Sequence, residues 1–465
     1  MVTERVSERI VCTGLLLTCC TGAAWPHATE QAFVLLLPTG VYTAAGVASV
    51  ALTALLLVVI PAAGASYLFR PFVLPRVPAH SLHYGTSALS TVLLLAAVWA
   101  GFGGARDPSE NPLPLLIWTI WWIGLVTVQG LLFDIWRWIN PWTAVVALIR
   151  KGTARIRRPR LPFGHVIGML TFLAFCAFLM VDPAPTDPAR LAGYVAVYWI
   201  TTLIGIVVFG PRWLYRAEAF SMMMRAYGRT RILGRTRGTS ALGLPGWRIL
   251  NRRTAPLGLG LFVLLLLGGG SFDGLNETYR WFTLLGINPL EFPGRSAVVL
   301  QNLIGLVAAN MVLIATFALT LLIGLLLIRE ESGLGRAMRI FAPSILPIAL
   351  GYHIAHYLTA FMVDGQYALV ALSDPMHRGD DFLGLGPHFV STGFFNTQNT
   401  VRAIWLTQAG AVVVGHILSL LLAHALAVSH YGSAQRAVVL QAPLAVFMVA
   451  YTLFGLWLLA SPRGG

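Results

Sequence analysis

The stretch from residue 297 to residue 328 reads AVVLQNLIGLVAANMVLIATFALTLLIGLLLI and holds no charged side chain. As a helix it extends about 48 Å, which exceeds the roughly 30 Å of a bilayer's hydrocarbon core. Lipid offers the backbone no hydrogen-bond partner, so an apolar run of this length crosses as an α-helix. The stretch therefore predicts a membrane protein built from helices.

The composition of the whole chain agrees with that prediction. Of its 465 residues 57% are hydrophobic and only 11% are charged, whereas soluble domains have about 45–50% apolar and about 25% charged residues. Disorder is excluded as well, because it requires low hydrophobicity. We expect an all-α, polytopic membrane helix bundle.

About ten apolar segments are long enough, or nearly so, to cross a bilayer. The shortest are the least secure, because a crossing helix needs about 17–25 residues. The predicted segments are 39–63, 87–102, 113–133, 163–181, 191–209, 255–269, 297–328, 340–363, 403–428 and 438–459.

Residues 1–24 resemble a secretory signal. A charged start is followed by a short apolar run from Ile10 to Cys20 and by small residues at positions 22–24, and such a run is too short to span. The alternative is an uncleaved first span. Residues 25–465 are predicted to form one membrane domain with its mature N-terminus outside.

The distribution of charge gives an independent test of this topology. With an outside start, 23 of the 32 basic residues fall in the loops placed inside, and 12 of the 18 acids fall outside. Basic loops remain in the cytoplasm. The net charge of +14 therefore indicates topology, and we predict no nucleic-acid partner.

Two inner segments have structural interpretations. In the long cytoplasmic loop 210–254, apolar residues at Phe220, Met223, Met224 and Tyr227 favour an amphipathic helix lying on anionic lipid. The second segment, FDIWRWINPW (133–142), is interpreted as an interfacial tryptophan belt with an ion pair between Asp134 and Arg137.

Histidines are the only ionisable side chains well inside the predicted spans, and such groups are functional candidates by default. His353 and His356 are three residues apart on one helix face. Their depths below the outer surface, about 15 and 10 Å, approach the roughly 20 Å of His416 on the next span. These three imidazoles are predicted to hold a zinc or copper ion. Alternatively, each of the three forms a hydrogen bond across a helix interface. His424 lies deeper in the membrane than His416.

The external loop 364–402 is long for a connection and carries acids and histidines, among them Asp364, Asp374 and His388. We interpret it as a lid over the histidines; the alternative is a solvated loop whose acids form turns and caps. His27, near the mature N-terminus, is a further candidate for copper. After the sixth segment, Asp273 lies among aromatic residues in either an interfacial belt or a pocket wall.

Several short motifs together resemble one family. No nucleotide-binding loop, nucleophile elbow or zinc-protease motif is present. The chain instead resembles the bacterial integral-membrane proteins of the fenitrothion hydrolase family over nearly all of residues 25–465. The matching motifs are PHA (26–28), ENPLP (110–114), DIWRWINPW (134–142), AEAF (217–220), FDGL (272–275), AHY (355–357), DGQ (364–366), SDP (373–375) and VVGH…LLAH (413–424).

This resemblance implies a hydrolase of organophosphorothioate triesters in the bacterial inner membrane, with His27, His356, His416 and His424 at matching places. Our hypothesis is that His353, His356 and His416 hold a metal while Asp364 or Asp374 activates water. The apolar substrate would enter from the lipid bilayer. The rival hypothesis is a copper-binding or copper-transporting protein that also uses His27 and His388. A haem protein is a third, less fitting alternative. The oligomeric state stays open.

Overall fold

The structure is a computed structural model that describes residues 34, 37–59, 62–75, 83–152, 159–161, 163–236, 238–251, 254–291, 294–386 and 388–463. The signal-like segment 1–24 and His27 lie outside these residues.

Long apolar helices make up most of the described chain, and they confirm the all-α polytopic class. Nine helical stretches are long and apolar enough to cross a membrane, and a tenth, α10, is one residue short of the same length. Each of the ten predicted segments corresponds to one of them. They are α3 (Thr39–Val59), α5 (His83–Gly103), α6, η1 and α7 in succession (Pro112–Leu131), α10 (His165–Val181), α11 (Pro188–Phe209), α15 (Leu257–Leu275), η3 with α17 (Arg295–Leu327), α18, η4 and α19 in succession (Leu334–Ser373), α20 (Gln398–Tyr431) and α21 (Ala434–Ala460).

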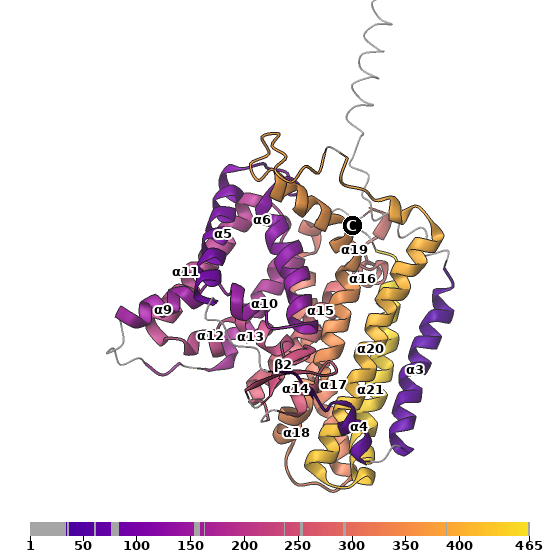
Figure 1. The fold of residues 1–465 in the computed structure, drawn as a ribbon. Coiled ribbons are helices and arrows are strands. Elements are labelled where there is room, and N and C mark those ends of the chain that lie inside the picture. Colours follow the sequence, from indigo (N-terminus) through magenta and orange to yellow (C-terminus); the bar gives the residue numbers. More distant parts are fainter. Residues whose placement is uncertain are drawn as a thin grey trace, which may run out of the picture.

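The spanning helices lie roughly side by side, with α17, α19, α20 and α21 forming one half of the bundle beside α3 (Figure 1). One contiguous core of buried side chains runs from Val50 to Met448. Large apolar side chains remain exposed on α3, α5, α11 and α17, for example Leu55, Trp99, Val197 and Leu326. Exposed apolar surface of this extent belongs against lipid, and the protein is a multi-pass membrane protein.

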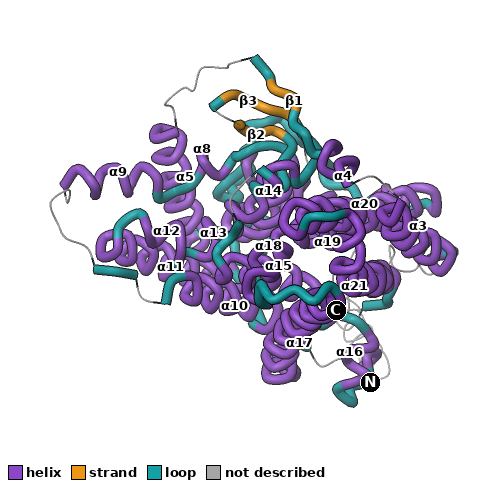
Figure 2. The backbone as a smooth tube through the Cα atoms, turned by 90° about the horizontal axis from the view of Figure 1, so that it is seen from below, coloured by secondary structure: helices purple, strands orange, loops and turns teal. Residues whose placement is uncertain are grey.

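Short elements complete the fold. A three-stranded antiparallel sheet in the order β1-β3-β2 lies near α4 and α14 at one end of the bundle (Figure 2); the sequence analysis expected no strands. The short elements are α4 (Ala62–Leu68), β1 (Phe72–Val73), α8 (Trp136–Ile139), α9 (Thr143–Gly152), α12 (Arg212–Arg216), α13 (Ala219–Tyr227), β2 (Leu233–Thr236), β3 (Thr239–Leu242), α14 (Trp247–Leu250), α16 (Tyr279–Leu284), η2 (Pro289–Glu291) and η5 (Gly393–Phe395).

Two helix ends differ from the prediction and change the position of candidate residues. Helix α15 continues past residues 268–270, where we ended the span, and reaches Leu275. Helix α19 continues past Val363 to Ser373, and α20 begins at Gln398. The external loop is therefore residues 374–397 rather than 364–402. The predictions ended each span where apolarity ended, whereas a helix continues as long as its backbone hydrogen bonds do.

Helix α13 was predicted correctly as a helix but wrongly as a surface element. Its three methionines, Met222, Met223 and Met224, are completely buried, and Tyr227 is nearly so. Glu218 caps its N-terminus by accepting hydrogen bonds from the backbone N–H groups of residues 220 and 221. The helix packs against α7, α10, α12 and α15, so that other helices cover it.

Helices α19 and α20 pack closely enough to bring their backbones into contact. A Cβ atom at Gly351 would lie 2.4 Å from the carbonyl oxygen of Ala411, and one at Gly415 would lie 2.5 Å from that of Pro347. Only glycine fits at either position. Small residues of this kind allow close helix packing in membranes, and here they bring together the two helices that carry the predicted histidines.

The chain between α7 and α9 is only partly helical, and hydroxyl groups of α5 satisfy its backbone. Four successive carbonyl groups each accept a hydrogen bond from an α5 hydroxyl at 2.5–2.7 Å. Non-helical backbone at membrane depth is tolerated only where protein or water satisfies it in this way. The pairs are Thr86 with Trp138, Ser90 with Ile139, Ser87 with Asn140 and Thr91 with Pro141.

We predict that Ser87→Ala destabilises the protein. Ser87 is completely buried; its hydroxyl donates to the Asn140 carbonyl and accepts from the Ala144 N–H. Removing it leaves both groups unsatisfied, at a cost of about 1–3 kcal/mol. Unfolding of the purified protein in detergent measures the change. The matched control is Ser49→Ala on α3, because the exposed Ser49 hydroxyl bonds only within its own helix. Equal stability of the two variants would contradict the account.

Candidate functional site

A carboxylate, an imidazole and a phenol meet between α15 and α19. Asp273 is 8% exposed, and its Oδ2 lies 3.1 Å from Nε2 of His356. The Tyr357 hydroxyl donates a hydrogen bond to the same oxygen. An ionisable group inside a helix bundle is costly unless it is paired, and Asp273 has two partners.

Tyr352 and Gly274 position the cluster formed by Asp273, His356 and Tyr357. Tyr352 precedes His356 by one helical turn and stacks on its ring, with centroids 5.6 Å apart and planes at 12°. A Cβ atom at position 274 would lie 1.8 Å from the Tyr352 hydroxyl oxygen. Gly274 therefore lets α15 approach α19 closely enough for Asp273 to reach His356.

The pairing determines which imidazole nitrogen is available for chemistry. A carboxylate only accepts hydrogen bonds, so the neutral His356 ring carries its proton on Nε2 and its lone pair on Nδ1. This Nδ1 atom is buried and has no hydrogen-bond partner, and the same holds for Nε2 of His353. An oriented imidazole with a free lone pair is the arrangement that general-base catalysis requires.

A small cavity adjoins these residues. Its volume of about 20 Å³ is enough for about one water molecule. Asp273, Tyr352, His353, His356 and Tyr357 contribute to its wall. The remaining wall is mainly aromatic and aliphatic, and includes Trp122, Phe172, Cys176, Met180, Tyr227 and Leu266. The site therefore combines an acid–base pair with largely apolar surroundings.

The other predicted membrane histidines lie elsewhere. On α20, His416 Nδ1 lies 2.8 Å from the Val412 carbonyl of its own helix, and its ring lies 6.3 Å from that of Tyr451. His424 Nδ1 lies 3.1 Å from the Gln441 side-chain oxygen on α21. His424 thus forms the contact across a helix interface that we gave as the alternative interpretation, whereas His416 bonds within its own helix. Nε2 of each ring is buried without a hydrogen-bond partner.

The predicted metal ligands do not come together as a set of three. Among the described residues, no group of three or more His, Cys, Asp or Glu side chains has an arrangement that could hold a metal ion. His353 and His356 share the site with Asp273, but His416 does not complete a ligand set with them. The described donors thus do not fit the expected three-histidine site, and metal binding stays a prediction of the sequence.

The two predicted catalytic acids lie away from His356. Asp364 is eight residues further along α19, which is about 12 Å of helix. Asp374 follows the end of α19, where its carboxylate accepts hydrogen bonds from the N–H groups of Arg378 and Gly379. The Arg378 contact is the largest cause that lowers the pKa of Asp374. Asp374 therefore orders the external loop, as in the alternative interpretation of that loop.

The remaining external candidates are also outside the site. His388 is exposed. Asp381 accepts hydrogen bonds from the N–H groups of Leu385 and Gly386 and from the Ser373 hydroxyl. These contacts lower the pKa of Asp381, the Gly386 contact being the largest cause. His377 contacts Glu110, with Nε2 3.5 Å from the carboxylate, and thus connects the loop to the segment before α6.

The sequence analysis gave Asp273 only as part of an interfacial belt or a pocket wall, of which the pocket wall is found here, and it did not assign Tyr352 or Tyr357. We placed Asp273 outside the membrane because the glycines at 268–270 were taken as the end of a span. The sequence did contain a signal: residues 257–275 hold no proline and no charge before Asp273, so a helix could continue to it. Tyr357 directly follows His356 in the AHY motif.

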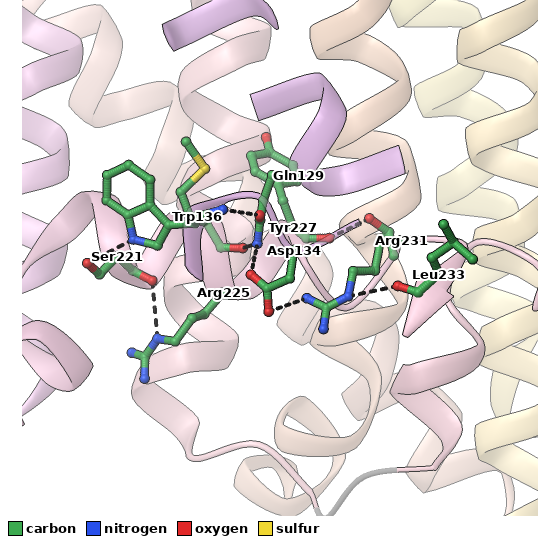
Figure 3. Close-up of polar contacts among 10 residues, drawn as sticks. Gln129, Asp134, Trp136, Ser221, Arg225, Tyr227, Arg231 and Leu233 are labelled. Atoms are coloured by element: carbon green, nitrogen blue, oxygen red, sulfur yellow. Dashed lines mark hydrogen bonds and ion pairs between the residues drawn. The ribbon is translucent and has the colours of Figure 1, made fainter. Parts of the chain in front are cut away.

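A second polar network lies around the segment DIWRWINPW (Figure 3). Asp134 pairs with Arg231 at 2.9 Å, so the predicted pair with Arg137 is wrong. Gln129 donates to Asp134 and to the Met224 carbonyl. Trp136 and Trp142 are buried rather than exposed in an interfacial belt. The segment is folded back against α13, where the Trp136 indole N–H and the Asn140 amide donate to the Ser221 hydroxyl.

Fold and site together define a multi-pass membrane protein with a buried Asp–His–Tyr cluster in its helix bundle. Comparison of the chain with protein-family models, with curated proteins and with solved structures finds no match. Its function is therefore inferred from the geometry of its own residues and from the resemblance noted in the sequence.

We predict that Asp374→Asn loosens the external loop. The ionised carboxylate is the acceptor for the loop N–H groups, and a neutral amide accepts more weakly. Limited proteolysis should cut the variant faster between residues 374 and 397. Asp380→Asn is the matched control, since Asp380 is exposed in the same loop. Equal cleavage of both variants would show that Asp374 does not order the loop.

The same contacts predict how the wild-type loop responds to pH. The folded-state pKa values of Asp374 and Asp381 are lowered, so the stabilisation is present above the unfolded pKa of about 3.9. It is lost as the pH falls through the lower folded values. Proteolysis with an acid-active protease should therefore accelerate only below about pH 4.

Proposed function

We propose that this chain is a membrane-embedded hydrolase of apolar phosphorus triesters, with His356 as its general base and Asp273 as the group that orients it. The observation that carries the proposal is the 3.1 Å contact between His356 Nε2 and Asp273, which leaves Nδ1 without a partner in a residue that lines a cavity of about 20 Å³. The resemblance to the fenitrothion hydrolase family supplies the class of substrate.

The proposed reaction begins with one water molecule in that cavity. His356 Nδ1 takes a proton from the water while the oxygen forms a bond to phosphorus. Asp273 stabilises the imidazolium cation that results. The bond from phosphorus to the aryl oxygen breaks, and the nitrophenolate leaves with the electron pair. His356 then returns its proton, and the products are a dialkyl thiophosphate and a nitrophenol.

Two tyrosines have supporting roles in this proposal. Tyr352 contributes to the cavity wall, and its buried hydroxyl has no hydrogen-bond partner. We propose that this hydroxyl donates to the charge that develops on the phosphoryl group. The Tyr357 hydroxyl already donates to Asp273. It helps to keep this carboxylate ionised, and thus keeps the proton of His356 on Nε2.

The size of the cavity constrains how substrate binds. A site for a drug-sized ligand has a volume of about 300–1,000 Å³, far above the 20 Å³ found here. In this proposal the structure is a closed form with room for about one water molecule, and the triester requires the aromatic wall around Trp122 and Phe172 to open. An apolar substrate dissolved in the bilayer reaches such a wall directly.

We also propose where the protein is located in the cell and how it is oriented in the membrane. The excess of basic residues in alternate loops supports a bacterial inner-membrane protein with those loops in the cytoplasm and the mature N-terminus outside. Asp273 and His356 then lie toward the outer side of the bilayer.

The decisive experiment is an assay of purified protein with a dialkyl nitrophenyl thiophosphate. Asp273→Asn and His356→Gln should each lower the rate by about 10²–10⁴-fold, which is the usual contribution of a general base. The exposed His388→Gln is the control and should keep full activity. A chelator should leave the rate unchanged, because no step of the proposed mechanism uses a metal.

Three results would contradict the proposal. The first is no turnover by the wild-type protein, and the second is turnover that persists in His356→Gln. The third is activity that a chelator abolishes and zinc or copper restores, which would favour the metal prediction instead. Metal analysis of the same preparation distinguishes an enzyme from a copper-binding protein.

A further inference from the structure

A second and larger cavity lies at the end of the bundle that carries the basic loops. Its volume is about 400 Å³, within the range of small-molecule sites. It lies where α10 and α15 begin, beside α12, α13 and α14. Its wall contains five arginines with one histidine and one aspartate, namely Arg216, Arg225, Arg229, Arg231, Arg248, His165 and Asp134.

Among the residues that line this cavity, guanidinium groups outnumber carboxylates. Asp134 is the one carboxylate among the lining residues, and it pairs with Arg231 at 2.9 Å. Arg225 contacts backbone carbonyl groups of Ser221 and Tyr215 (Figure 3 shows the first). A carbonyl carries only a partial charge and does not neutralise a guanidinium. The lining residues therefore carry more positive than negative charge.

Arg248 gives a separate indication that a ligand belongs here. Its side chain is part of the cavity wall, the residue is only 7% exposed, and its Nη1 atom has no hydrogen-bond partner. A buried guanidinium that forms no ion pair is costly, and the charge of an anion in the cavity would lower that cost. In addition, burial lowers the pKa of Arg225, which an anionic ligand would oppose.

We propose that this cavity binds a phosphate group. Guanidinium groups match the oxygens of a phosphate in bidentate geometry, and several of them converge here. The phosphate has two possible sources, an anionic phospholipid headgroup or free phosphate ion. This inference is independent of the proposed hydrolase activity, because it uses a different cavity and different residues.

The test uses the full-length protein, purified and delipidated in detergent. Thermal unfolding is measured with inorganic phosphate, with short-chain phosphatidylglycerol, with short-chain phosphatidylcholine and with chloride at equal ionic strength. A ligand that binds only the folded state raises Tm. Stabilisation by phosphate supports the site with free phosphate as its source. Stabilisation by phosphatidylglycerol alone supports a lipid headgroup. No stabilisation beyond phosphatidylcholine and chloride overturns the proposal.

Two exposed arginines of α12 provide a matched pair of variants. Arg216 lines the cavity, whereas Arg212, one helical turn earlier, does not. Arg216→Gln should weaken binding by about tenfold, as expected for loss of one charged contact, and Arg212→Gln should not. Arg248→Gln should weaken phosphate binding at least as much. If that variant fails to fold, the comparison of Arg216→Gln with Arg212→Gln still tests the proposal. Equal binding by Arg216→Gln and Arg212→Gln would overturn the proposal.

Discussion

The carboxyl group of Asp273 is the group on which the arrangement of the helices around the site depends. A charge within a helix bundle in lipid must be paired by its own protein, and Asp273 finds its partners on α19, at His356 and Tyr357. That contact requires α15 and α19 to approach closely, which Gly274 permits. Helix α19 is in turn held against α20 through Gly351 and Gly415. The pairing of Asp273 therefore requires the close packing of α15, α19 and α20 that the glycines allow.

The same need for partners explains the less regular parts of the molecule. Residues 138–141 depart from a spanning helix, and hydroxyl groups of α5 satisfy their carbonyls. Glu218, which is 1% exposed, caps α13 and also accepts a hydrogen bond from the Tyr198 hydroxyl. The motifs DIWRWINPW and AEAF, which contribute to the family resemblance, therefore have structural roles. Among the buried polar atoms that such contacts do not satisfy are the free imidazole nitrogens beside Asp273, Nε2 of His416 and of His424 on α20, and Nη1 of Arg248.

The helix class and the ten spans could be predicted because they follow from apolar run length and charge distribution, both of which are local properties. The candidate site was only half predicted. His353 and His356 were found because they are ionisable groups inside an apolar run. Asp273 was missed because its helix was ended too early, and no local pattern specifies which helix packs against α19. Partner choice is a tertiary property, as the pairing of Asp134 with Arg231 instead of Arg137 also illustrates.

The most direct test of the central claim, that Asp273 and His356 act as one unit, is a double-mutant cycle on the free energy of unfolding. The variants are Asp273→Asn, His356→Gln and both together. Each single change leaves a buried polar partner poorly paired, so we expect the double variant to be less destabilised than the sum of the singles, with a coupling of about 1–3 kcal/mol. Effects that add within about 0.3–0.5 kcal/mol would mean that the two side chains do not interact, and would contradict the account.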